Sequence, residues 1–444
     1  MDDIDEWLDS QEEDLIRDIS QLVRIPSISE AGSEAYPFGK NCADALKTML
    51  GFGRKYGFST ENIDWYCGTI GFGDGRKEIS LWNHLDVVPG SPNGIYPSFL
   101  CTREGNYLIG RGTQDNKGPA VAVLYVMRYL KDHGAIKNIR IKQVLGCSEE
   151  CGMQDVKYYF LRNRPSDFSV VADCSFPVCC GEKGICRVTF ATSCLSRDLF
   201  LLECGQVPNN IPSGARALIG GKLYEAGGTG GHAAFPEHAD NALRKLCTEI
   251  SGADVDEEGR RVINFANAFS TDGYGTEMGI ACRDALSGNL TCNLGVIKTK
   301  GRKIVFEADI RYPITVSADL IRAELEKRAE EYGFRMEQFT DRPPYYMEAD
   351  NPLIGLLSDA FAEETGKSEK PYVMGGGTYA RKIPNAISFG PGFKEEDRPA
   401  FLPVGHGSCH SADECQSLAN LKKAIRIYIR ALMKIDKFYG GNKS

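Results

Sequence analysis

The chain has 444 residues, more than one hydrophobic core usually serves, so we expect two domains. Its formal net charge of −8 argues against a nucleic-acid partner, and no apolar run is long enough to cross a membrane. The acidic start contains no apolar signal core, which predicts a cytoplasmic protein. The sixteen cysteines show no paired C-x-x-C spacing and are interpreted mainly as reduced, buried thiols.

The apolar pattern predicts a helix in the first 25 residues that stops at Ile25-Pro26, and a second helix near 41–56. Three short apolar runs follow, each ending in ionisable residues: 79–82, 139–145 and 168–171. A helical pattern over 116–130 separates the first two runs. Strands that alternate with helices in this way are typical of a mostly parallel, doubly wound sheet.

The pattern of predicted elements changes near residue 184. From there, strands with alternating polarity (184–192, 290–297, 304–310) mix with helices such as 241–250 and 318–332. After about residue 347 the pattern of the first part of the chain returns, with helices at 352–365 and at the end of the chain. We therefore expect an α/β catalytic domain (1–185 and 347–444) that is interrupted by an inserted α+β lid domain (186–346).

The ionisable residues after the three strands are of the types that bind metals. His84 ends the first run, Glu149 and Glu150 follow the second, and Asp173 follows the third. Ligands of such sheets bind beyond the carboxyl ends of the strands, so these groups are expected to share one site. One glutamate would bind a metal and the other would act as a base.

Three further residues complete the predicted centre. Asp115 lies in a glycine-rich loop, where it could bridge two cations about 3.5–4 Å apart. His410 could complete the second ligand set, and Asp86 could orient the ring of His84. Taken singly, each residue has an ordinary alternative, such as a turn for Asp115 or a helix cap for Asp173.

Four motifs together resemble a known family. The co-catalytic zinc metallopeptidases, which include glutamate carboxypeptidase, aminoacylase, succinyl-diaminopimelate desuccinylase and the bacterial dipeptidases, have similar motifs in the same order. The motifs here are His84-Leu-Asp-Val-Val-Pro89, Gly110-Arg-Gly-Thr-Gln-Asp-Asn-Lys-Gly118, Glu149-Glu150 and His410-Ser-Ala-Asp-Glu414.

The resemblance implies how the roles are divided. One metal would be held by His84, Asp115 and Asp173, and the other by Asp115, Glu150 and His410. Glu149 would then be the base, and the Asp115–Asn116 bond would be cis. The H-x-x-D-E spacing selects His410 over the nearby His406 as the ligand. The two divalent metal ions are expected to be zinc or manganese, with cobalt as a further option.

The insert resembles the lid of this family. Gly228-Thr-Gly-Gly-His232 is similar to the motif of a lid histidine that stabilises the oxyanion. Three substrate-binding elements resemble those of the bacterial dipeptidase branch. These elements are Asn209, Arg311 and a loop for the C-terminal carboxylate with Gly376, Gly377, Thr378 and Arg381. A plain tight turn is the alternative for this loop.

These features predict a metallopeptidase that cleaves dipeptides, with a small peptide as its only expected partner. The first alternative is a deacylase of N-acetyl or N-succinyl amino acids, which would use the same catalytic residues. A non-catalytic metal-binding protein is a more distant alternative, because Glu149 and every ligand are present. The resemblance to the dipeptidase branch, with its larger lid, implies a monomer, and a homodimer formed through the lid is the alternative.

Overall fold

The structure is a computed structural model that describes residues 3–393 and 399–441. The chain divides into two compact units. The first unit contains Met1–Gly181, Met347–Tyr372 and Thr378–Ser444, and the second contains Glu182–Tyr346 and Val373–Gly377. The expected boundaries give the segment Val373–Gly377 to the catalytic domain, but in the structure it belongs to the second unit. Backbone and side-chain hydrogen bonds from Lys183 and Arg311 to this segment explain its place in the second unit.

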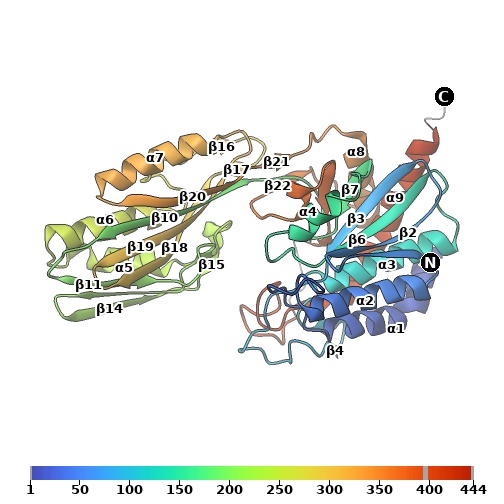
Figure 1. Cartoon of the computed structure of the whole chain (residues 1–444), viewed down its shortest axis with the longest axis horizontal. Helices are drawn as coiled ribbons and strands as arrows, with labels where there is room; N and C mark the ends of the chain where they lie inside the picture. The colour runs from blue at the N-terminus through green and yellow to red at the C-terminus, as the bar shows by residue number, and fades with distance from the viewer. Residues whose placement is uncertain (1–2, 394–398, 442–444) are drawn as a thin grey trace. The chain divides into compact units, whose positions relative to one another are not determined.

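The first unit is built around a mixed sheet with the order β1-β2-β6-β3-β7-β23-β9, of which Figure 1 labels β2, β6, β3 and β7. The central strands β6, β3, β7 and β23 pair in parallel, whereas β2 pairs antiparallel with β1 and β6, and β9 pairs antiparallel with β23. The predicted α/β fold class is therefore confirmed, with parallel pairing confined to the centre of the sheet. The strands are β1 Ser59–Ile63, β2 Cys67–Phe72, β3 Lys77–His84, β6 Ile139–Gly146, β7 Phe168–Val171, β9 Val178–Glu182 and β23 Ala386–Phe389.

Helices pack on this sheet and on each other. The helix α3 lies against β3 and β6 and also contacts α1 and α9, while α8 packs on α9 and α2 on β1 and β2. Nearly all of α3 is buried, which explains why its sequence is apolar on almost every side. The helices are α1 Asp3–Val23, α2 Lys40–Lys55, α3 Lys117–Asp132, α4 Gln154–Phe160, α8 Pro352–Thr365 and α9 Leu418–Gly441.

The second unit has its own core beneath an antiparallel sheet with the order β14-β13-β11-β18-β19-β10-β20. Phe265 of α6 lies at the centre of this core, stacked on Phe306 and against Phe334. The strands are β10 Gly184–Ser193, β11 Leu199–Cys204, β13 Gly214–Ile219, β14 Lys222–Gly227, β18 Thr291–Lys300, β19 Lys303–Tyr312 and β20 Arg335–Arg342. The helices are α5 Ala242–Glu249, α6 Glu257–Ser270 and α7 Ala318–Glu331.

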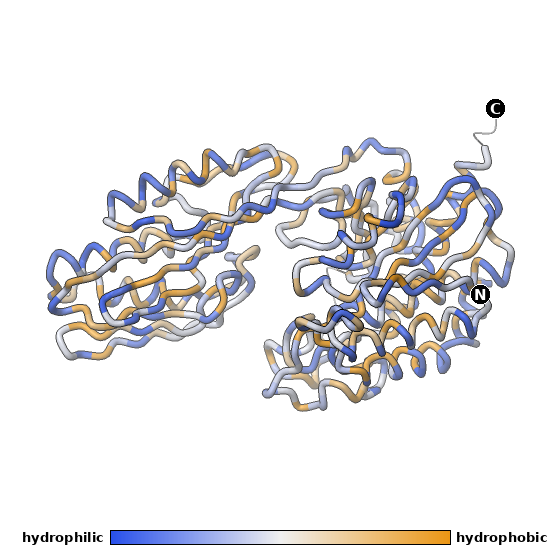
Figure 2. Tube along the Cα trace, viewed as in Figure 1, coloured by the Kyte–Doolittle hydropathy of each residue, from blue (hydrophilic) through white to orange (hydrophobic). Residues whose placement is uncertain are grey.

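Figure 2 shows hydrophobic stretches along the strands of both sheets and alternating stretches along α1 and α7, as expected of helices with one buried face. Among the described helices, none has the length and apolar character needed to span a membrane. All sixteen cysteines fall in the described part of the chain as free thiols, and most are buried.

Candidate active site

The ionisable residues predicted to share a site lie at one edge of the first unit's sheet. His84 is the last residue of β3, Glu149 and Glu150 follow β6 closely, and Asp173 lies two residues after β7. The three strands are adjacent and parallel, in the order β6-β3-β7. Their carboxyl ends therefore meet at the same edge, where ligands bind in open α/β sheets.

Asp115 lies between two histidines. Its Oδ1 is 2.8 Å from Nε2 of His84, and its Oδ2 is 3.0 Å from Nε2 of His410. Each histidine has a second carboxylate nearby: Asp173 Oδ2 is 3.7 Å from the His84 nitrogen, and Glu150 Oε1 is 2.8 Å from the His410 nitrogen. The two oxygens of Asp115 thus face two separate sets, each with one imidazole and one further carboxylate.

The orientation of the His84 ring is fixed by a hydrogen bond to the main chain. Its Nδ1 lies 2.9 Å from the backbone carbonyl of Asp86, which can only accept a hydrogen bond. The Nδ1–H therefore donates to this carbonyl, and Nε2 faces the carboxylates as a candidate ligand atom. The Asp86 carboxylate lies farther away, with Oδ1 3.5 Å from Nδ1. The carbonyl of Asp86 is thus the nearer partner of the ring, with the carboxylate of the same residue beside it.

The carboxylates and imidazoles of the cluster shift one another's pKa values. Burial opposes a charged His84, but the carboxylates of Asp173 and Asp115 raise its pKa well above the usual range. Burial also opposes a charged His410, yet Asp115 and Glu150 raise its pKa to about 11. Burial raises the pKa of Asp173 to about 7.

Burial likewise raises the pKa of Glu149 well above its usual range, whereas the hydrogen bonds from both histidines overcome burial and lower that of Asp115. One atom each from His84, Asp115 and Glu150 lies within 4.8 Å of the others. Oxygen and imidazole donors that converge at this spacing are suited to divalent cations. The residues present therefore fit a two-metal centre.

Buried carboxylates hold the loops that carry these groups. The Asp86 oxygens accept hydrogen bonds from the backbone amides of Glu149 and Glu150, at 3.1 and 3.0 Å. Glu414 Oε1 accepts from the amides of Gly112, Gln114 and Asp115, and its Oε2 accepts from Arg111. Each carboxylate is fully buried but well supplied with donors, so its burial is compensated.

Asn116 contacts a proposed metal ligand in a way that the sequence did not reveal. Its Nδ2 donates to Asp173 Oδ1 at 2.9 Å and to the carbonyl of Ala172, and its Oδ1 accepts from Asn83. These contacts leave Asp173 Oδ2 directed toward His84. The Asp115–Asn116 peptide bond is cis, as the family resemblance implied. A side-chain amide at this position was visible in the sequence, but its partners were not.

The histidines His406 and His410, four residues apart in the sequence, contact different groups. His406 Nδ1 lies 2.6 Å from Asp413 Oδ2, and Asp413 accepts hydrogen bonds from the amides of Ile95 and Tyr96. His410 instead faces Asp115 and Glu150. His410 adopts a left-handed backbone conformation with φ of 61°, which is uncommon for a residue other than glycine.

The predicted oxyanion residue His232 and two predicted substrate-binding residues, Asn209 and Arg311, lie in the second unit. His232 is in β15 (Gly231–His232), which pairs with β12 (Asn210–Ile211), and Asn209 directly precedes β12. Arg311 Nη2 is 3.5 Å from His232 Nε2, and Arg311 Nε donates to Asp309 Oδ1 at 2.9 Å. The structure thus brings His232 and Arg311 together within this unit.

The predicted carboxylate loop is split between the units. Gly376 and Gly377 belong to the second unit, where the neighbouring Gly375 carbonyl accepts a 2.6 Å hydrogen bond from Arg311. Thr378 begins the last part of the first unit, and its hydroxyl accepts from the amide of Ala380 to cap the short helix η3 (Tyr379–Lys382). Arg381 is partly buried in η3.

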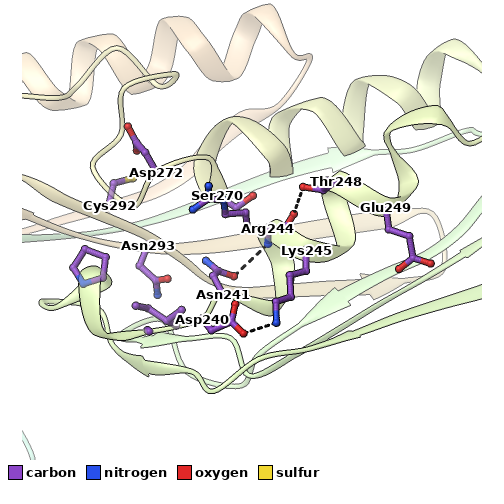
Figure 3. Close-up of a pocket in the computed structure, with 14 residues that line it drawn as sticks. Asp240, Asn241, Arg244, Lys245, Thr248, Glu249, Ser270, Asp272, Cys292 and Asn293 are labelled. Carbon is purple, nitrogen blue, oxygen red and sulfur yellow. Dashed lines mark hydrogen bonds and ion pairs between the residues drawn. The ribbon is translucent and has the colours of Figure 1, made fainter.

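A cavity of about 420 Å³ lies within the second unit (Figure 3). Three of its charged side chains have local partners: Lys245 pairs with Asp240, and Asp272 accepts from the amides of Tyr274 and Gly275. Asn209, His232 and Arg311 are not among the described residues that line it. This cavity is therefore distinct from the predicted substrate-binding groups.

Comparison with known proteins places the chain in a family. Residues 81–434 match the model of peptidase family M20/M25/M40. YtjP of Bacillus subtilis (strain 168) is 28% identical over 96% of this chain and 98% of its own length. The Beta-Ala-Xaa dipeptidase of Lactobacillus delbrueckii subsp. lactis is 27% identical over 97% of this chain and 98% of its own length.

A solved structure shows the same fold. Human carnosine dipeptidase 1 superposes with a TM-score of 0.61 at 13% identity, covering 98% of each chain. The family match extends over most of the sequence and includes every proposed metal ligand. The chain therefore belongs to peptidase family M20/M25/M40 and is a peptidase, a hydrolase of peptide bonds.

Proposed function

We propose that this peptidase is a dipeptidase with a two-metal centre. The observation that carries the proposal is the placement of Asp115, whose two oxygens face two separate histidine–carboxylate sets. His84, Asp115 and Asp173 would hold one cation. Asp115, Glu150 and His410 would hold the other.

The donor set suits zinc or manganese, with cobalt as a further option, because it mixes imidazole nitrogen with carboxylate oxygen. When bound, two such cations supply Lewis acidity that polarises the scissile carbonyl and favours ionisation of water. Other residues of the chain would hold the proposed ligands in position. Asn116 directs Asp173, and Glu414 holds the loop of Asp115.

Glu149 is proposed as the general base. Its backbone amide donates to the carboxylate of Asp86, as does the amide of Glu150, the proposed ligand. Its carboxylate makes no hydrogen bond to the part of the chain that the structure describes, so it is free to accept a proton. It would take a proton from the attacking water and deliver it to the nitrogen of the leaving amine.

The proposed substrate-binding roles follow from the family resemblance, and the chemistry of the residues suits them. His232 would donate a hydrogen bond to the carbonyl oxygen as it gains charge, and Asn209 would bind the substrate backbone. The guanidinium groups of Arg311 and Arg381 would bind the C-terminal carboxylate. Gly376, Gly377 and Thr378 would contribute main-chain contacts to the same group.

Dipeptides are the proposed substrates. Two of the similar proteins are named as dipeptidases, the Beta-Ala-Xaa dipeptidase and carnosine dipeptidase 1. The catalytic residues would also serve an acyl amino acid, since an amide is cleaved in either case. The substrate class is therefore the point that an experiment must decide.

The test begins with protein stripped by a chelator and reloaded with Zn²⁺, Mn²⁺ or Co²⁺. A panel of dipeptides is assayed beside N-acetyl and N-succinyl amino acids. We expect no turnover after stripping, recovery with at least one metal, and dipeptides as the preferred substrates. Cleavage of acyl amino acids without cleavage of dipeptides would replace the proposal with the deacylase, and full activity after stripping would remove the metal centre.

A further inference from the structure

The loop that carries Glu149 and Glu150 is held by every one of four consecutive backbone amides. The amides of Cys147 and Ser148 donate to Asp155 Oδ2 at 2.7 and 2.8 Å. The next two amides donate to the carboxylate of Asp86. Each of two buried carboxylates thus accepts two of the four amides of this loop. Only one of them, Asp86, has a role in the mechanism proposed above.

Asp155 lies in the first turn of α4 and is fully buried. Its Oδ2 also accepts a hydrogen bond from the hydroxyl of Tyr379, while its Oδ1 accepts from the amide of Val156. Tyr379 is the first residue of η3 and directly follows Thr378, one of the proposed substrate-binding residues. The hydroxyl therefore joins the loop of the catalytic glutamates to the segment that carries Thr378.

Packing leaves this link little freedom. Tyr379 is fully buried, and its ring contacts Trp82 and His84 edge-on, with centroids 5.9 and 6.3 Å apart. A Cβ atom at Gly146 would overlap both the Tyr379 hydroxyl and the Asp155 carboxylate. Glycine at the end of β6 is thus what lets the hydroxyl reach the carboxylate beneath the loop.

We infer that Asp155 and Tyr379 are positioning residues that set the placement of the Glu149–Glu150 pair, a role that rests on the proposed function of these glutamates. Asp155 fixes the first half of the loop as Asp86 fixes the second. The Tyr379 hydroxyl fixes the Asp155 oxygen that accepts both amides. Small displacements of a catalytic group cost far more in turnover than in substrate binding.

The chain offers a matched control for this inference. Tyr159 belongs to the same buried cluster as Tyr379, and its ring also contacts Trp82. Its hydroxyl has no hydrogen-bond partner among the residues that the structure describes. Tyr379→Phe and Tyr159→Phe therefore remove the same atom from the same cluster, but only the first removes a hydrogen bond to Asp155.

The experiment compares both variants with the wild type in two ways. Hydrogen exchange of the metal-free protein is resolved to single amides over residues 146–153. Dipeptide turnover is then measured for metal-loaded protein and expressed per bound metal. Asp155→Asn serves as a second variant on the other side of the hydrogen bond.

For Tyr379→Phe we expect the amides of Cys147 and Ser148 to exchange about tenfold faster. Both donate to Asp155 Oδ2, which would no longer be held by the Tyr379 hydroxyl. We expect kcat to fall about tenfold, with KM within about twofold and metal content unchanged. Tyr159→Phe should match the wild type in exchange and in kcat. Asp155→Asn should exceed Tyr379→Phe in both effects.

Three outcomes would overturn the inference: unchanged exchange at Cys147 and Ser148 in Tyr379→Phe, an equal fall in kcat for Tyr159→Phe, or an effect confined to KM. Failure of the proposed function looks different. An inactive wild-type protein would count against the dipeptidase, while the exchange measurement would still decide whether Tyr379 and Asp155 hold the loop.

Discussion

The proposed metal centre and the proposed lid residues are built by different means. His84 is 1% exposed, and the ligand loops around it are held by buried carboxylates that accept backbone amides. His232 is exposed on a strand of two residues. The first arrangement fixes charged groups before any ligand arrives, whereas the second leaves a histidine accessible. The proposed ligands thus lie in a rigid, buried setting that suits precise placement, whereas the proposed oxyanion histidine lies on an exposed strand.

The largest effect is expected for the base. Glu149→Gln should lower kcat by about 10³–10⁴-fold, because the carboxylate that accepts the proton of water is lost. Metal content, measured by elemental analysis, should stay at two ions per chain, whereas Glu150→Gln should lose one. If Glu149→Gln lost metal in proportion to activity, the two glutamates would have exchanged roles.

A pair of histidine variants tests which ring belongs to the centre. His410→Ala should weaken binding of one metal by several hundred-fold, since it removes a ligand that lies against Asp115 and Glu150. His406→Ala should change metal affinity less than about tenfold, because His406 contacts Asp413 instead. Titration with a chelating indicator measures both. Similar losses in the two variants would contradict the ligand assignment.

The protons held by the metal-free cluster predict a pH dependence. His84 and His410, with pKa values raised by the carboxylates beside them, are protonated at pH 7 and must lose their protons before metal binds. Asp173, whose pKa burial raises to about 7, is partly protonated as well. Metal binding should therefore release at least two protons per chain, and the apparent affinity should rise about 100-fold or more per pH unit near pH 7. Calorimetry in buffers with different ionisation enthalpies measures this release. An affinity that is constant between pH 6 and 8 would contradict the coupling.

The smallest effect tests the second unit. Arg311→Lys keeps the charge but loses the planar fork that contacts Asp309 and Gly375, so KM for dipeptides should rise about tenfold. Metal content should not change. Arg187→Lys is the control, because Arg187 lies 3.8 Å from the same Asp309 on an exposed position. A rise in KM in both variants would assign the effect to Asp309 and not to substrate binding.

Much of the catalytic unit could be predicted because its signals are local. The apolar runs that became β3, β6 and β7 end directly before the ionisable residues, and parallel neighbours must place those ends at one edge. In the second unit, the prediction recognised β10, β18 and β19 but not α6, whose Phe265 centres the core. The boundary segment Val373–Gly377 was also assigned to the other unit, because its hydrogen bonds lie far away in sequence.

The sequence by itself determined the kind of chemistry, since ligand-type residues and their spacing are written in it. Only the tertiary structure decided which groups hold those ligands in place. Tyr379 and Asp155 are separated by 224 residues, and Glu414 and the amide of Asp115 by 299. A buried carboxylate requires donors, but no local pattern names them, because any backbone amide can serve once the fold brings it within reach.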